Sequence, residues 1–278
     1  MSKHSARALL IPVVLPVIFV VGGGLGSTLL QSVGLLPLIG PARLTGENFA
    51  AGGNELPLSI GVSLGIASAA TLLAALIGGA IALAVVAGGW LGRVVGATSA
   101  AAVTIPHLIA AAAIGLLLAN SGFLPRLLHI APNFWPDLVG SPWWIAVIIE
   151  YAWKESAFVG LVVVGTLATR VSQFDETAAL LGASRWVRVR MVFLPLAAPS
   201  LIIASTISFV YTLGSYEVAW LLGRTYPEPL AVMAIRLFNG LSVLSRPGGA
   251  AIAMITVLIS GIAVTVGLFA ARRTAVWR

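Results

Sequence analysis

The sequence predicts an all-α polytopic membrane protein with six transmembrane helices. Three observations support this fold class: 59% of the 278 residues are hydrophobic, only 9% are charged, and long uncharged stretches recur along the chain. An ordinary soluble domain has about 25% charged residues. The net charge of +7 would suit a nucleic-acid-binding protein, but the apolar content argues against nucleic acid as a partner.

Charged residues mark where membrane spans end, because a charge at the bilayer centre costs about 2.5–3.5 kcal/mol. Five gaps between charged residues exceed the roughly 20 residues that a helix needs to cross the hydrocarbon core. A sixth run follows Ser141 and Pro142, which we expect to begin a helix. The expected spans are residues 9–34, 58–86, 96–119, 142–167, 193–214 and 249–271, in one domain over residues 1–278.

Basic residues predict the orientation, since cytoplasmic loops are enriched in Lys and Arg. Six spans put both termini on the same side of the membrane. Ten Lys and Arg residues then fall on the side of the termini and five on the other side. This count predicts cytoplasmic termini, and it places the loop of residues 170–192 in the cytoplasm.

The chain lacks the residues for several kinds of chemistry. It has no cysteine, which excludes disulfides and thiolate metal sites. Neither Lys3 nor Lys154 follows a glycine, so there is no phosphate-binding loop for ATP. The three histidines have no metal-ligand spacing. We therefore expect no catalytic residue, bound cofactor or metal in this chain.

The loop of residues 170–192 has the pattern of two short helices. Ser172 followed by Asp175 fits a capping box at the start of the first helix. Gly182 fits the left-handed position that ends a helix, and Ser184 fits the cap of a second helix. Pro195 fits the opening turn of the next span. A short amphipathic hairpin of this kind is suited to a groove in a partner protein.

This loop resembles the signature of the permease subunits of bacterial ATP-binding cassette importers. The signature reads E-A-A, three residues, G, nine residues, I-x-L-P. Here Glu176-Thr177-Ala178 is followed at the same spacing by Gly182 and by Val192-Phe193-Leu194-Pro195. Thr177 and Val192 depart from the pattern. The resemblance covers residues 58–271 and looks most like the group of permeases for polyamines, thiamine, ferric ion, sulfate and molybdate.

The resemblance implies a type I importer permease whose loop forms a coupling helix docked on a separate ATPase. The residues implied in this contact are Glu176, Thr177, Ala178, Leu181, Gly182, Ala183, Leu194 and Pro195. It also implies two ATPase subunits that use ATP and magnesium, a second permease subunit, identical or homologous, and an extracytoplasmic substrate-binding protein. The implied location is the bacterial cytoplasmic (inner) membrane. Arg185, Arg188 and Arg190 are expected to face anionic membrane lipids.

Ionisable residues inside a span usually face a cavity or a protein partner. Glu150 and Lys154 have the i,i+4 spacing of an ion pair, and we expect them to neutralise each other. Glu155 lacks a partner within the helix, which leaves either a contact with a second subunit or a role in the solute path. Together with Glu217 these residues are candidates for the path, and a pathway carboxylate favours a cationic or amine substrate. The alternative function is an ion-gradient-driven secondary transporter that uses Glu150 and Glu155.

Two further expectations concern polar or partly apolar segments. His107 is expected to bond to a neighbouring helix, with a role in substrate binding or proton relay as the alternative. The outer segment of residues 215–238 is expected either to fold back against the mouth of the bundle and touch a binding protein, or to be an ordered connecting loop.

Overall fold

The structure is a computed structural model that describes residues 12, 14–167 and 171–274, with the backbone alone for residues 171–173. The described residues form helices joined by loops, and none of them lies in a β-strand. The all-α prediction is confirmed. The first residues of the expected span 9–34 and the first residue of the loop 170–192 lie outside the described residues.

Within the part of the chain that the structure describes, five helical segments are long and apolar enough to cross a membrane. They are Val14–Ser32, Gly53–Ala87, His107–Leu127, Arg185–Gly214 and Val243–Thr274. Helix α7, Ile145–Leu167, which falls in the expected span 142–167, has 23 residues and carries Glu150, Lys154 and Glu155, and it is not among these five. The chain is therefore a multi-pass membrane protein.

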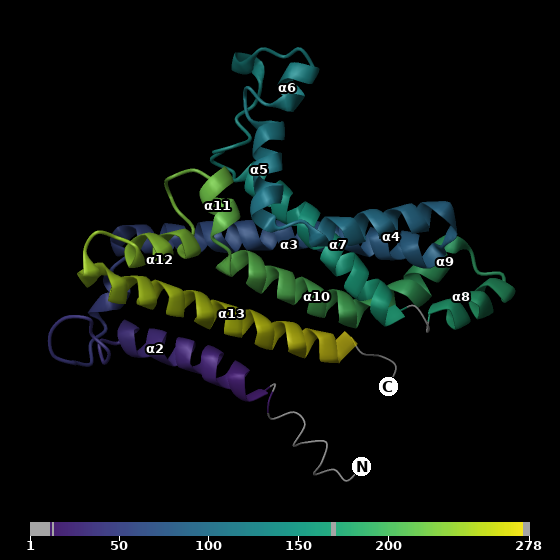
Figure 1. Cartoon of the computed structure of the whole chain (residues 1–278). Helices are drawn as coiled ribbons and strands as arrows, with labels where there is room; N and C mark the ends of the chain where they lie inside the picture. Colours follow the sequence, from purple (N-terminus) through teal and green to yellow (C-terminus); the bar gives the residue numbers. More distant parts are fainter. Residues whose placement is uncertain (1–11, 13, 168–170, 275–278) are drawn as a thin grey trace, which may run out of the picture. The chain divides into compact units, whose positions relative to one another are not determined.

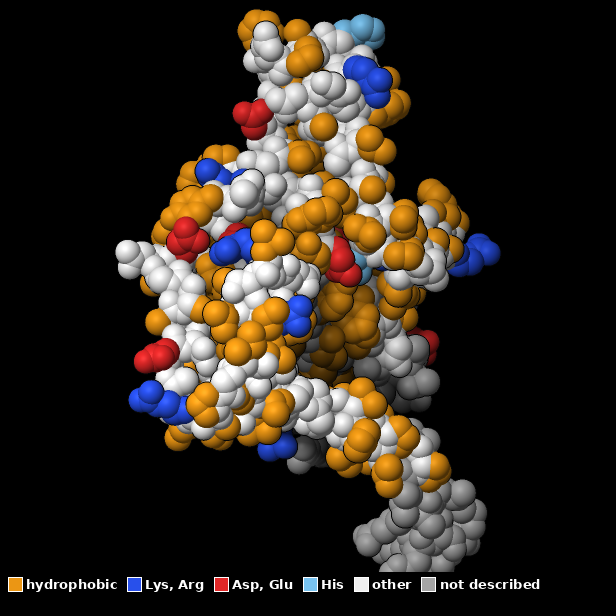
Figure 2. All heavy atoms as spheres, turned by 60° about the vertical axis from the view of Figure 1, so that its left-hand side comes forward, with side chains coloured by type: hydrophobic (Ala, Val, Ile, Leu, Met, Phe, Trp, Pro, Cys, Tyr) orange, Lys and Arg blue, Asp and Glu red, His pale blue; other side chains and the backbone are white. Residues whose placement is uncertain are grey.

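The long helices expose large hydrophobic side chains, as expected of surfaces that face lipid. Leu72 and Leu76 of one helix and Leu116 of another are among the most exposed of them. Figure 2 shows hydrophobic side chains spread over the face in view, with few charged side chains between them. Soluble proteins rarely expose apolar surface on this scale.

Residue contacts divide the chain into two compact units. The first unit comprises Met1–Pro57 and Leu230–Leu258, and the second comprises Leu58–Pro229 and Ile259–Arg278. Helices α3 (Leu56–Ala87) and α13 (Arg246–Thr274) contribute residues to both units. The single permease domain over residues 1–278 stays a prediction.

The first unit is built around α2 and α12. Besides parts of α3 and α13, its elements are η1 Ile18–Gly22, α2 Gly23–Ser32, η2 Glu47–Ala50, η3 Gly53–Glu55, α12 Leu230–Phe238 and η6 Val243–Ser245. The amide of Asn48 donates to the carbonyl oxygen of Ser32 at 3.0 Å, which ties the loop after α2 to the end of that helix. Leu230 and Met233 of α12 are fully buried.

The second unit is centred on α7, which packs against α4, α5, α10 and α11. Besides parts of α3 and α13, its elements are α4 Gly89–Thr104, α5 His107–Leu118, α6 Phe123–Leu127, η4 Pro132–Phe134, α7 Ile145–Leu167, α8 Val171–Leu180, α9 Arg185–Arg188, η5 Val189–Phe193, α10 Leu194–Gly214 and α11 Glu217–Leu222. Val159, Val163 and Leu167 of α7 form a buried core with Phe193 and Ala204. In Figure 1, α10 runs from α9 at one end to α11 at the other.

Small residues bring α3 and α7 into close contact. A Cβ atom at Gly160 would lie 2.6 Å from Cγ2 of Ile81, and one at Gly78 would lie 2.8 Å from Cβ of Val159. Packing through glycine lets two membrane helices approach closely and gain dispersion contacts. These glycines therefore hold α7 in the position from which its charged residues face α4 and α5.

The turn between α3 and α4 is shorter than expected. Gly88 and Gly89 both have φ +74, a conformation that glycine adopts without steric cost. Helix α4 therefore starts at Gly89, within the stretch of residues 87–95 that separates two of the expected spans.

The expected span 96–119 is not one helix, and this prediction is wrong. Helix α4 ends at Thr104, Ile105 is extended with ψ 126, and α5 begins at His107. Pro106 explains the break, because a proline has no amide hydrogen and disfavours helical geometry in the residue before it.

The expected helix start at Ser141 and Pro142 is also wrong. The hydroxyl of Ser141 accepts a hydrogen bond from the backbone of Trp143 at 3.1 Å and thereby stabilises a turn. Trp144 then has φ +57, which is incompatible with a right-handed helix. Helix α7 begins only at Ile145.

Candidate functional site

The first candidate region is the α8–α9 segment, residues 171–188, whose turn has the geometry that the sequence predicts. Gly182 has φ +79 and follows the end of α8. The amide of Ala183 donates to the carbonyl of Ala178 at 3.0 Å, and the amide of Gly182 donates to that of Ala179 at 3.0 Å. These two bonds make a Schellman motif, so the prediction that Gly182 closes the helix is confirmed.

The second helix of this segment is capped and tied to the first. The hydroxyl of Ser184 accepts from the amide of Val187 at 3.5 Å, as its predicted role requires. Nη1 of Arg188 lies 2.5 Å from Oδ2 of Asp175, so this arginine pairs with α8, whereas it was expected to face lipid. The side chain of Ser172, which the sequence predicts to cap the first helix, lies outside the described part of the structure.

The α8–α9 segment presents apolar groups beside a carboxylate. Leu180 is 89% and Leu181 is 83% exposed. Glu176 is exposed, and Trp186 adds a third large apolar group. Exposed leucines next to a tight turn make a surface suited to a partner groove.

The other residues of the signature fall on and after this turn. Thr177 and Gly182 are exposed, whereas Ala178 and Ala183 are half-buried. Leu194 is exposed at the start of α10, and Pro195 stands in the first turn of that helix, as predicted. The signature therefore joins the exposed segment directly to a membrane helix.

The second candidate region is a polar cluster in α7. Glu150 is 0%, Lys154 is 3% and Glu155 is 6% exposed. Charged side chains at this burial need partners, because an isolated charge in an apolar medium is strongly disfavoured.

Lys154 is hydrogen-bonded to main-chain carbonyls at the break between α4 and α5. Its Nζ donates to the carbonyl oxygens of Ala102 at 2.6 Å and Ile105 at 2.5 Å. The predicted Glu150–Lys154 ion pair does not form, and the break at Pro106 explains this. The carbonyl of Ala102 also accepts from the amide of Ile105 at 3.3 Å, and Ile105 itself lies in the extended break after α4, where the ammonium group supplies a donor to its carbonyl.

His107, the first residue of α5, stands between the two carboxylates. Its Nδ1 is hydrogen-bonded to Oε1 of Glu150 at 3.0 Å, and its Nε2 lies 3.5 Å from Oε1 of Glu155. The expected bond from His107 to a neighbouring helix is confirmed. Glu155 also accepts a hydrogen bond from the hydroxyl of Ser208 on α10 at 2.5 Å, so it has partners on two other helices.

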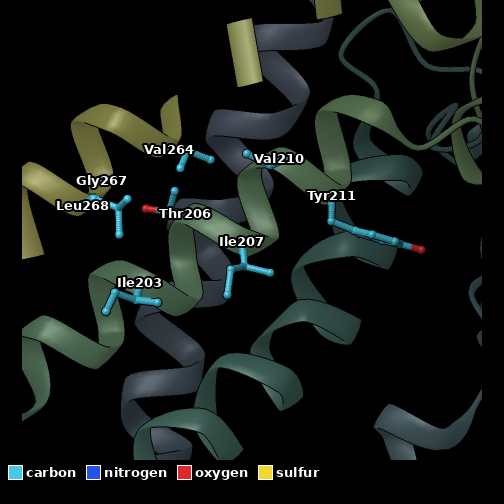
Figure 3. A pocket seen from close by; sticks show the side chains of 8 residues that line it. All are labelled: Ile203, Thr206, Ile207, Val210, Tyr211, Val264, Gly267 and Leu268. Carbon is cyan, nitrogen blue, oxygen red and sulfur yellow. The ribbon is translucent and has the colours of Figure 1, made fainter. Parts of the chain in front are cut away.

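Cavities follow one face of α10 and meet at Tyr211. A cavity of about 210 Å³ is lined by His107, Lys154 and Glu155 together with Tyr211. A second one, of about 420 Å³, lies between α10 and the end of α13 and has an apolar lining. Figure 3 shows the Tyr211 ring pointing away from the α13 residues of that second cavity, whereas Thr206 points toward Gly267.

Glu217 lies at the start of α11 and lines a third cavity, of about 460 Å³, that Tyr211 also lines. The hydroxyl of Ser215 donates to its carboxylate at 3.4 Å. Helix α11 packs on α5 and buries Val218 and Leu222, so this part of the segment 215–238 folds back onto the second unit. The four pathway candidates therefore divide: Glu150, Lys154 and Glu155 form one cluster, and Glu217 stands at the edge of the next cavity.

Comparison with known proteins decides the family. Residues 74–274 match the family described as binding-protein-dependent transport system inner membrane component. The chain belongs to this family. Among individual relatives, it is 26% identical over 160 residues to the sulfate transport system permease protein CysT of Salmonella typhimurium, with 56% of each chain covered. It is 33% identical over 64 residues to the molybdenum transport system permease protein ModB of Azotobacter vinelandii, covering 23% of this chain and 28% of ModB.

The chain spans about half the length of the sulfate permeases that it matches, with 42% of CysT of Escherichia coli covered at 26% identity. Solved structures extend the likeness in fold to nearly the whole chain. A chain of a bacterial alginate ABC transporter, solved in complex with a pentasaccharide-bound periplasmic protein, superposes with a TM-score of 0.75 at 18% identity, covering 98% of this chain and 95% of that one. A chain of an amino acid ABC transporter superposes with a TM-score of 0.57 at 17% identity, covering 79% and 94%. None of these relatives is an ion-gradient-driven secondary transporter.

Two residues of the polar cluster escaped the sequence analysis, Ser208 and Tyr211. Both are polar residues in the apolar span 193–214, and their spacing of three residues puts them on one face of a helix. This spacing was a signal that could have identified them as facing the protein interior rather than lipid. Among the described residues, no group of three His, Asp or Glu residues could hold a metal ion.

Proposed function

We propose that the chain is the transmembrane permease subunit of an ATP-binding cassette importer. It forms the solute path and is driven by a separate ATPase that docks on the α8–α9 segment. The single observation that carries this proposal is the importer signature at an exposed, doubly hydrogen-bonded turn, in a chain of the binding-protein-dependent transport family.

The α8–α9 segment is linked to the polar cluster through the chain and two side-chain contacts. Arg188 and Asp175 join α9 to α8, so a push on α8 reaches the second short helix as well. η5 then continues directly into α10, which packs along α7 and holds Glu155 through Ser208. Movement of α8 therefore shifts α10 and changes the cavities along its face.

The family and the neighbouring structures support a proposal for the partners. Two ATPase subunits bind and hydrolyse ATP with magnesium, while this chain holds no cofactor of its own. A second permease subunit, identical or homologous, completes the path, and an extracytoplasmic binding protein delivers the solute. The alginate transporter, which shares the fold, was captured with its periplasmic protein. The complex lies in the bacterial inner membrane, with the α8–α9 segment and both termini in the cytoplasm.

Two substitutions in the α8–α9 segment test the proposal. We expect Glu176→Lys and Gly182→Asp to abolish co-purification of the ATPase and ATP-dependent uptake. The first reverses an exposed charge in the docking surface, and the second puts a side chain at φ +79. Co-purification in mild detergent and uptake into membrane vesicles measure the two effects.

Glu55→Lys is the matched control, because Glu55 is also exposed but belongs to the first unit. It should retain the ATPase and uptake, and all three variants should reach the membrane in normal amounts. Normal uptake by both Glu176→Lys and Gly182→Asp would contradict the proposed function.

A further inference from the structure

A groove between α10 and α13 has a lining suited to hydrocarbon. It is the cavity of about 420 Å³ described above, and we call it the α10–α13 groove. Thr206 and Tyr211 are the polar residues of its lining. The hydroxyl of Thr206 donates to the carbonyl of Ile202 at 2.8 Å, and the ring of Tyr211 points away from the α13 residues (Figure 3). The lining therefore offers little to a polar solute and is complementary to an apolar chain.

The groove is open to the surface of the second unit. Gly267 has no side chain, and a Cβ atom there would overlap the side chain of Thr206, so α10 and α13 touch at this point. Ile207 and Leu268, which stand beside this contact, are 51% and 47% exposed. An apolar chain can therefore enter the groove from the side, without passing through the interior of the protein.

The length of the groove matches the depth of one membrane leaflet. Ile203 and Tyr211 mark its two ends on α10, and the eight positions between them correspond to about 12 Å along a helix axis. The hydrocarbon core of a bilayer is about 30 Å thick, so one leaflet is about 15 Å deep. An acyl chain of one leaflet is therefore long enough to fill the groove from end to end.

A basic residue follows the groove on α13. Val264 and Leu268 line the groove, and Arg272 lies four residues after Leu268, on the same face of the helix and one turn further on. Arg272 is exposed, and no carboxylate of the described residues pairs with it. The guanidinium of Arg273, in contrast, lies over the ring of Phe269 at 4.3 Å from its centroid. The groove thus ends beside an uncommitted positive charge.

We propose that the α10–α13 groove binds one anionic phospholipid of the cytoplasmic leaflet, with an acyl chain along Ile207 and Leu268 and the phosphate at Arg272. A free phosphate ion has no chain to fill the groove, and a zwitterionic lipid brings no net charge to the arginine. The orientation predicted from the basic residues puts the end of α13 on the cytoplasmic side, where anionic lipids attract arginine. This inference goes beyond the proposed function, because it depends on neither the ATPase nor the solute.

Native mass spectrometry of the purified full-length chain in mild detergent tests the inference. The probes are dioleoylphosphatidylglycerol, which is anionic, and dioleoylphosphatidylcholine, which is zwitterionic and has the same acyl chains. We expect the first bound lipid to be the phosphatidylglycerol, with a preference of about fivefold, since one basic residue near a membrane surface contributes roughly that factor. Sodium phosphate at the same concentration should not displace it.

Arg272→Gln should abolish the preference for the anionic lipid. Arg93→Gln is the matched control, because it removes an exposed arginine of α4 that does not line the groove, and it should keep the preference. Val264→Trp puts a larger side chain into the groove and should weaken the binding of both lipids at least about fivefold, because less acyl surface is buried. Val266→Trp, at an exposed position of α13 outside the groove, should not weaken it.

Three results would each overturn the inference: equal affinities of the two lipids for the native chain, a preference that survives in Arg272→Gln, or displacement of the lipid by sodium phosphate. If Val264→Trp does not fold, as judged by size-exclusion chromatography, Arg272→Gln decides, since its substitution lies at an exposed position. If the folded Val264→Trp binds both lipids normally but separates a dimer into single chains, the groove is an interface between copies of this chain and the inference is wrong.

Discussion

Lys154 shows how one side chain makes a broken membrane helix possible. A break at Pro106 frees carbonyl oxygens at the end of α4 in an environment with no water to satisfy them. The ammonium group carries three donors, and two of them reach the oxygens of Ala102 and Ile105. The proline and the lysine thus depend on each other, although they are 48 residues apart in the sequence.

Replacing Lys154 by methionine should therefore destabilise the protein while keeping its apolar volume. The carbonyl of Ile105 would lose the ammonium donor and that of Ala102 would keep the amide of Ile105, so we expect the free energy of unfolding to fall by about 1–3 kcal/mol. Thermal unfolding in detergent, followed by tryptophan fluorescence, would report this as a lower midpoint.

Arg93→Met is the control for this prediction. Arg93 is exposed on α4 and donates to the carbonyl of Gly89 at a long 3.4 Å. Its replacement should change the stability by less than about 0.5 kcal/mol. Equal midpoints for the two variants would show that the bonds of Lys154 contribute nothing.

At the scale of helices, the contact between α3 and α7 depends on the absence of side chains. Gly160→Val should push against Ile81 and lower the stability by about 1–3 kcal/mol, as expected of overpacking. Gly165→Val on the same helix meets open space and should cost much less. The difference between the two unfolding midpoints is the measurement, and a larger loss in Gly165→Val would contradict the close packing.

The elements that could be predicted from the sequence are those with local causes. The turn at Gly182, the cap at Ser184 and the position of Pro195 each depend on residues within a few positions. Long apolar runs likewise predict spans to within a few residues, as for α3 and α10. The break at Pro106 had a local signal too, but the apolar run around it suggested a continuous helix.

The polar cluster could be predicted only in part, because its partners are distant in sequence. His107 and Glu150 are 43 residues apart, and Glu155 and Ser208 are 53 apart. The spacing of Glu150 and Lys154 suggested an ion pair because the sequence does not reveal main-chain acceptors. Those acceptors exist only where α4 ends, so the partner of Lys154 could be found only after the helix break was known.

At the scale of the whole molecule, one helix, α10, connects two regions of the second unit. The exposed α8–α9 segment precedes α10 along the chain (Figure 1). The cavities that meet at Tyr211 follow one face of that helix. The central claim is that a partner ATPase docks on the first region and drives movement in the second. This claim requires the α8–α9 segment to lie in the cytoplasm against the ATPase.

Cross-linking from a single cysteine tests that claim most directly, since the native chain has no cysteine. Leu181 and Leu241 are both strongly exposed, and the orientation predicted from the basic residues puts them on opposite sides of the membrane. With the ATPase in native membranes, Leu181→Cys should cross-link to it through a short bifunctional reagent, and Leu241→Cys should not. A cross-link from Leu241→Cys and none from Leu181→Cys would contradict the account.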